Sequence, residues 1–142
     1  MTSEEIISKL PYTSPFLFVD EITSISEEGV QGSYVFNPEM DFYKGHFKDN
    51  PITPGVILIE VMAQIGVVCL GIYILSNEFT SETQIALTGC EVEFIKPVFP
   101  SEKVMVVSEK IYFRFGKLKC NVKMINNKGV EVCKGVICGM II

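Results

Sequence analysis

The residues best suited by type and spacing to carry out chemistry are His46, Glu60 and Gln64. His46 is the only histidine of the chain and precedes a long apolar run that contains the other two. Because Glu60 and Gln64 are four positions apart, they would share one face of a helix. Both would need polar partners there, since unpaired burial is costly. An imidazole and a carboxyl group in an apolar cleft can act as base and acid near neutral pH, because burial raises the pKa of the carboxyl group.

Gly55 could add a backbone hydrogen-bond donor to this set. Thr53-Pro54-Gly55 is typical of a helix start, with Thr53 as the N-cap and Pro54 at the first helical position. An N–H at a helix start has no acceptor within the helix, and glycine lets a carbonyl oxygen approach closely. Such a donor can stabilise negative charge on an enolate or thioester oxygen. The Thr53 hydroxyl could instead cap this N–H or the next one.

Each of these residues also has a structural interpretation. A single histidine in a loop is more often solvated or hydrogen-bonded than catalytic, and Glu60 could belong to a salt-bridged interface. Spacing alone therefore leaves catalysis and structure open.

Length and composition limit the class of protein. The 142 residues, 48% hydrophobic and 20% charged, fit one folded domain over residues 1–142. The net charge of −5 argues against nucleic acid as a partner, because phosphate binding needs surplus Lys and Arg. Five scattered cysteines without a CxxC pair suit reduced thiols of a cytoplasmic protein better than disulfides or a zinc site. The acidic N-terminal residues do not form an export signal.

The first third of the chain predicts a short helix and a hairpin. Thr2 and Glu5 resemble a capping box, so we expect a leading helix through about Leu10. The segments Phe16–Ile22 and Gly29–Asn37 are rich in β-branched and aromatic residues and flank a turn, which is typical of two paired strands.

The remainder predicts one long helix followed by an antiparallel sheet. Residues 38–53 lack periodicity and are expected to form a loop, and Val56–Leu75 is expected to be helical. Four strand-like segments follow, at 84–95, 102–115, 117–126 and 130–142. Short connections favour antiparallel pairing. Because the helix is apolar nearly all round, we expect an α+β fold in which a curved sheet wraps around it.

The long apolar run could instead span a membrane, since it carries a single charge over about twenty residues. Glu60 and Gln64 would then lie in the apolar layer, and the strands on either side would be separated by the bilayer. We therefore expect a buried central helix and no membrane span.

The segment Gly45–Gln64, GHFKDNPITPGVILIEVMAQ, closely resembles the signature of the (3R)-3-hydroxyacyl-[acyl carrier protein] dehydratases of the FabZ type. Leu10–Ile22 resembles the opening segment of that family, and Phe94–Val104 resembles a later proline-containing stretch. The resemblance covers nearly the whole chain. It departs at Tyr12, where the family usually has histidine, and at Lys96 and its neighbours, where the family is richer in arginine.

The resemblance implies a hotdog fold and a homodimer, or a higher oligomer, with active sites between subunits. By position, His46 matches the catalytic histidine and Glu60 the catalytic carboxylate of the opposite subunit. Gly55 matches the backbone donor to the thioester carbonyl. The resemblance further places Gln64 one turn beyond the acid, and Phe47 and Val56 beside the substrate.

The implied reaction is syn elimination of water from a 3-hydroxyacyl thioester on acyl carrier protein. His46 would take the C2 proton and Glu60 would protonate the departing hydroxyl. No metal or organic cofactor is implied, because the thioester itself acidifies C2. Two alternatives stay open: a hotdog thioester hydrolase, in which Glu60 activates water, and a non-catalytic acyl-binding or partner subunit.

An acidic carrier would need a basic patch on this acidic chain. We expect some of five cationic residues to flank the mouth of the active site: Lys96, Lys103, Arg114, Lys117 and Lys119.

Overall fold

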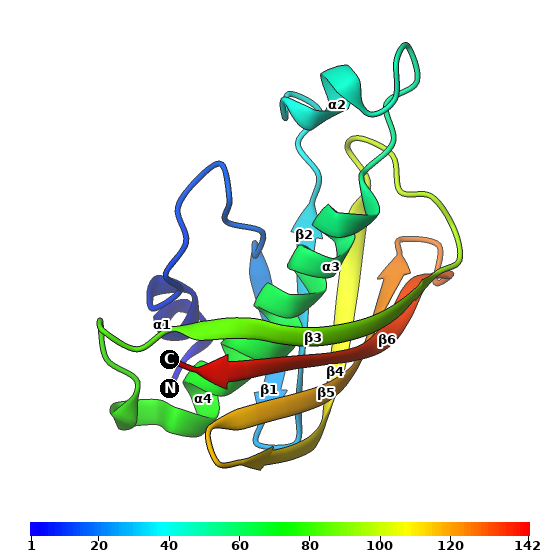
Figure 1. Ribbon diagram of the computed structural model, residues 1–142. Coiled ribbons are helices and arrows are strands. Elements are labelled where there is room, and N and C mark those ends of the chain that lie inside the picture. The colour runs from blue at the N-terminus through cyan, green and yellow to red at the C-terminus, as the bar shows by residue number, and fades with distance from the viewer.

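Six antiparallel strands curve around one long helix in the computed structural model, which describes residues 1–142 (Figure 1). The strand order is β1-β2-β4-β5-β6-β3, so β1 and β3 form the two edges of the sheet. The strands are β1 (Glu21–Ser26), β2 (Gly29–Val35), β3 (Ile85–Phe94), β4 (Lys103–Arg114), β5 (Lys117–Asn126) and β6 (Glu131–Ile141). The expected α+β fold with a wrapped antiparallel sheet is confirmed.

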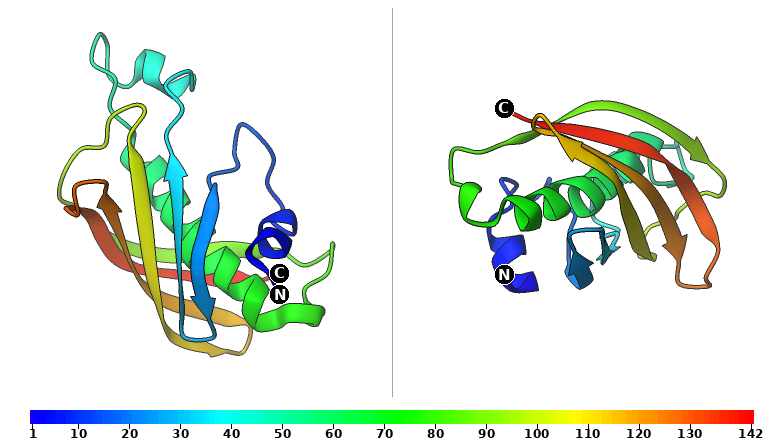
Figure 2. Two further views of the ribbon diagram at one scale, coloured as in Figure 1. Left: turned by 180° about the vertical axis from the view of Figure 1, so that it is seen from behind. Right: turned by 90° about the horizontal axis from the view of Figure 1, so that it is seen from below.

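The central helix has three parts that run on from one another. They are α3 (Gly55–Ala63), a π-helical stretch (Gln64–Cys69) and α4 (Leu70–Leu75), followed by a 3₁₀ turn at Ser76–Glu78. By length and composition Gly55–Glu78 could cross a membrane, a test that the core helix of a soluble protein also passes. Its most apolar window is 72% buried, and the sheet lies against its side (Figure 2). The prediction of a buried central helix is confirmed.

Strands β4 and β5 follow the alternating pattern expected of a sheet with one covered face. Leu118, Cys120, Val122 and Met124 of β5 are all buried against the helix side, and the residues between them are more exposed. The predicted bounds of all four later strands are correct to within one or two residues.

The first strand begins later than predicted. We expected a strand over Phe16–Ile22, but β1 spans Glu21–Ser26. The difference has a long-range cause: the N–H of Phe18 bonds to the side chain of Gln64, 2.8 Å away, and not to a neighbouring strand. Phe18 and Val19 are buried, so their apolar character reflects packing in the core.

The π-helical stretch lies where the helix approaches the sheet most closely. A Cβ at Gly66 would lie 3.0 Å from Val122 and 3.1 Å from Ser108, so a larger residue would force the strands outward. The Ser108 hydroxyl donates to the Gly66 carbonyl over 2.8 Å. Ser108 thus ties β4 to the π-helical stretch.

The segment expected to be a loop contains a short helix, α2 (Phe42–Gly45), which projects beyond one end of the sheet (Figures 1 and 2). The start of α3 also differs from the prediction, because Pro54 is the N-cap and Gly55 the first helical residue. Thr53 does not cap the helix: its hydroxyl lies 2.6 Å from the Tyr43 hydroxyl, in the core. The leading helix α1 (Ser3–Ser8) has the predicted capping box between Thr2 and Glu5.

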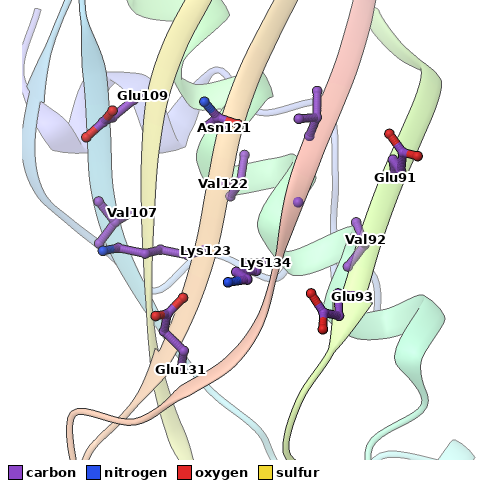
Figure 3. A pocket seen from close by; sticks show the side chains of 12 residues that line it. Glu91, Val92, Glu93, Val107, Glu109, Asn121, Val122, Lys123, Glu131 and Lys134 are labelled. Atoms are coloured by element: carbon purple, nitrogen blue, oxygen red, sulfur yellow. The ribbon is translucent and has the colours of Figure 1, made fainter.

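A hollow of about 540 Å³ lies on the face of the sheet that points away from the helix (Figure 3). Its charged lining residues are Glu91, Glu93, Glu109, Glu131, Lys123 and Lys134. None of the residues singled out for chemistry borders it, so its size does not make it the candidate site.

Candidate active site

His46 ends α2 and is held by three hydrogen bonds. Its backbone N–H donates to the Phe42 carbonyl over 2.9 Å, and its backbone carbonyl accepts from the N–H of Ile52 over 2.9 Å. The ring atom Nδ1 lies 2.8 Å from the Ile52 carbonyl oxygen. Because a carbonyl can only accept, Nδ1 carries the proton of the neutral ring, and Nε2 is left with a free lone pair. His46 is therefore presented as a base through Nε2.

Phe47 fixes the plane of this imidazole. The two rings stack with centroids 3.9 Å apart and an interplanar angle of 29°. Phe47 itself is 53% exposed. The neighbouring loop is closed by paired hydrogen bonds between the backbones of Phe47 and Asn50. His46 therefore lies on a projecting segment that backbone hydrogen bonds hold in place.

Glu60 lies on α3 and is held by Gln64 one turn later. The Gln64 side-chain amide donates to Glu60 Oε2 over 2.9 Å and to the Phe16 carbonyl over 3.0 Å. Its carbonyl oxygen accepts from the N–H of Phe18. Gln64 is fully buried, and every hydrogen-bonding atom of its side chain has a partner. It therefore fixes both the orientation of Glu60 and the path of the Phe16–Phe18 segment.

Burial raises the pKa of Glu60 above its ordinary value, and the hydrogen bond from Gln64 opposes this by favouring the charged form. Tyr12 is close enough to feel the same carboxylate: burial and the Glu60 charge raise the pKa of its phenol to about 12. A carboxyl group with a raised pKa can hold a proton at higher pH than an exposed one, which suits a general acid.

Glu60 and Tyr12 border a small cavity of about 50 Å³ between the central helix and the sheet. The rest of its lining is almost wholly apolar: Ala63, Val67, Val68, Ile85, Leu87, Ile137, Cys138 and Gly139. His46 is not among the residues that line this cavity, and it forms no hydrogen bond with Glu60. Within one chain the structure joins Glu60 to Gln64 and Tyr12, and leaves His46 on the projecting α2 segment.

Gly55 opens α3 with an N–H that has no hydrogen-bond partner in the protein. The ring of Phe94 packs against the Cα of Gly55, since a Cβ at Gly55 would be 2.9 Å from the Phe94 ring. Val56 follows it and is 72% exposed. With Thr53 bonded to Tyr43, the possibility that the Thr53 hydroxyl caps the Gly55 N–H is excluded, and the donor is free to bind an oxygen.

Two features of the site were not foreseen from the residues themselves. Phe94 covers Gly55, and Tyr43 anchors Thr53 just before the helix. The Phe94 contact joins segments far apart in the chain, and the Tyr43 contact spans ten residues. Neither an aromatic residue in a strand nor one in a short helix signals such a partner.

The sheet wrapped around a single helix defines the chain as a hotdog-fold protein. A dehydratase heterocomplex from Xenorhabdus doucetiae matches it with a TM-score of 0.79 at 12% identity, over 99% of this chain and 91% of the other. A mutant thioesterase from Pseudomonas aeruginosa matches with a TM-score of 0.70 at 10% identity, over 100% of this chain and 94% of the other. At such identities these likenesses establish the fold alone.

Sequence similarity identifies the family to which this hotdog-fold chain belongs. The family model of the FabA-like domain matches residues 10–138. The 3-hydroxyacyl-[acyl-carrier-protein] dehydratase FabZ of Caldicellulosiruptor bescii is 35% identical over 136 residues, which are 93% of this chain and 92% of that protein. The FabZ of Clostridium perfringens is 33% identical over 141 residues, 96% of each chain. The chain belongs to the FabA-like family.

Proposed function

We propose that the chain eliminates water from (3R)-3-hydroxyacyl thioesters on acyl carrier protein and gives trans-2-enoyl thioesters. Relatives of nearly the same length, 33–35% identical, are 3-hydroxyacyl-[acyl-carrier-protein] dehydratases. The observation that carries the proposal is the Glu60 carboxyl group, held by Gln64 at the wall of an apolar cavity. The free thiols and buried core helix agree with a cytoplasmic enzyme.

We assign the proposed roles to three groups. His46 Nε2 takes the proton from C2, while Glu60 gives its proton to the 3-hydroxyl, so the C3–O bond breaks and the C2–C3 double bond forms. The free N–H of Gly55 stabilises the negative charge that develops on the thioester oxygen. Phe47 and Val56, both exposed, are proposed to contact the bound thioester.

The structure supports a homodimer through the edge strand β3. One side of β3 pairs with β6, and its other side has no strand beside it. Leu87 and Phe94 on this edge are each 49% exposed. An exposed apolar edge is a site where a second sheet can pair. We infer that two β3 strands pair antiparallel about a two-fold axis, which would bring the projecting α2 of one subunit toward the α3 of the other.

The most direct test of the function is incubation of the purified protein with 3-hydroxyacyl carrier-protein substrates, followed by mass spectrometry. A product lighter by one water is expected. Free acid as the product would instead identify a thioester hydrolase, and unchanged substrate that stays bound would identify an acyl-binding subunit.

The five cationic residues expected to flank the site do not form one cluster. Lys103 starts β4 and Arg114 ends it, so about 36 Å separates them. Arg114, Lys117 and Lys119 lie at the β4–β5 hairpin, where the Arg114 guanidinium stacks 4.1 Å from the centre of the Tyr112 ring. In an antiparallel dimer the hairpin end of one subunit lies on the same side as the α2 end of the other. We infer that the hairpin of one subunit docks the carrier for a site shared with its partner.

Reversing charge at this hairpin should weaken carrier docking without harming the chemistry. We expect Arg114→Glu with Lys117→Glu to lower kcat/KM for carrier-linked substrate about tenfold at low salt, because steering by opposite charges is lost. Turnover of a small 3-hydroxyacyl N-acetylcysteamine thioester should not change. The control is Lys123→Glu with Lys134→Glu, on the outer face of the sheet. Equal effects of the two double variants would rule out the hairpin as the docking surface.

A further inference from the structure

The cavity beside Glu60 follows one face of the central helix. Glu60, Ala63 and Val67 line it, and Gly71 continues the same face one turn later. Apart from Glu60 and the Tyr12 phenol, the lining offers only apolar side chains and the Cys138 thiol. The ionisable carboxyl group thus lies at the Glu60 end of the cavity. The other end, toward Val67 and Gly71, is apolar and suits a hydrocarbon tail.

Ile85, the first residue of β3, closes the deeper end. A Cβ at Gly71 would lie 2.5 Å from Ile85 Cδ1, and a Cβ at Gly139 would lie 2.9 Å from Ile85 Cγ2. A Cβ at Gly139 would also lie 2.9 Å from Val67 Cγ1. The Ile85 side chain therefore occupies the space that two glycines leave open, between the helix and β6. It blocks the path from Val67 toward Gly71.

The dimensions of the cavity bound the length of chain that fits. Seven residues separate Glu60 from Val67, which is about 10 Å along a helix. An extended hydrocarbon advances about 1.3 Å per carbon, so about eight carbons beyond C3 would reach Ile85.

We propose that Ile85 is the floor of the acyl pocket and limits the enzyme to 3-hydroxyacyl chains with no more than about eleven carbons. This inference rests on the proposed dehydratase activity and names the substrates that the same site accepts. Longer chains meet the Ile85 side chain, which cannot withdraw without vacating its contacts at Gly71 and Gly139.

The test is a series of 3-hydroxyacyl carrier-protein substrates from four to sixteen carbons, with kcat/KM measured for each. For the unmodified protein we expect kcat/KM to fall at least about tenfold between the six- and fourteen-carbon substrates. Ile85→Ala should raise the fourteen-to-six ratio at least about tenfold, and Ile85→Phe should lower the accepted length. The matched control is Ile111→Ala, which makes the same change on β4 outside the cavity and should leave the profile as it is.

The outcomes separate the two proposals. Conversion of long and short substrates at similar rates by the unmodified protein would overturn the role of Ile85 while leaving the dehydratase function intact. The same holds if Ile85→Ala and Ile111→Ala give identical profiles. If no chain length is dehydrated, the proposed function itself fails. Melting curves and the mass in solution are measured for each variant, and if Ile85→Ala does not fold, Ile85→Val must shift the profile in the same direction.

Discussion

Glu60→Gln is expected to lower turnover by a factor of about 10²–10⁴, because it removes the proton donated to the departing hydroxyl. Gln64 can still contact the side chain at position 60, so the fold should melt at nearly the same temperature. Mass spectrometry of the acyl product measures the loss, and Glu93→Gln, on the exposed face of β3, is the control. An active Glu60→Gln variant would show that the general acid is another group.

The same residue predicts a pH dependence. Only protonated Glu60 can donate to the leaving hydroxyl, and burial raises the pKa of this carboxyl group. Turnover should therefore fall as the pH rises through that raised pKa, and the decline should begin at higher pH than for an exposed glutamate. Measuring kcat from acid to alkaline pH tests this, and a kcat that does not fall at high pH would contradict it.

Gln64→Leu is expected to destabilise the fold. Leucine fills much of the same volume but cannot accept from the buried N–H of Phe18, and an unpaired buried donor costs about 1–3 kcal/mol. We expect Tm to fall by roughly 5–10 °C. The hydrogen bond to Glu60 is also lost, so the pKa of Glu60 should rise further and the alkaline decline of kcat should move to higher pH.

Gln31→Leu is a suitable control, since Gln31 lies on the exposed face of β2 and its side chain makes no hydrogen bond. Its Tm should stay within about 1–2 °C of the unmodified protein. Similar Tm values for the two leucine variants would mean that Gln64 does not anchor the Phe16–Phe18 segment.

Much of the fold could be predicted from local patterns. The alternation in β4 and β5 predicts strands with one buried face, and the apolar run predicts a buried helix. The failures occurred where long-range contacts override local patterns. Phe18 is apolar and extended, which predicts a strand, yet its N–H pairs with a side chain 46 residues away. No local pattern signals such a partner.

The site was predicted only in part for a similar reason. Glu60 and Gln64 share a helix, so their hydrogen bond followed from their spacing. The Nδ1 contact of His46 depends on a loop whose shape the sequence does not encode in any periodic way. The basic residues appeared clustered because they are near in sequence, but a strand of twelve residues carries its two ends far apart.

Mixing two inactive variants tests directly whether His46 of one subunit acts with Glu60 of the other. His46→Ala and Glu60→Gln homodimers should each be nearly inactive. After random subunit exchange, half the dimers are mixed, and each mixed dimer has one site with both residues intact. We expect activity to recover to about a quarter of that of the unmodified protein. If exchange is demonstrated by mass spectrometry and the mixture stays inactive, the two residues do not form a site across subunits.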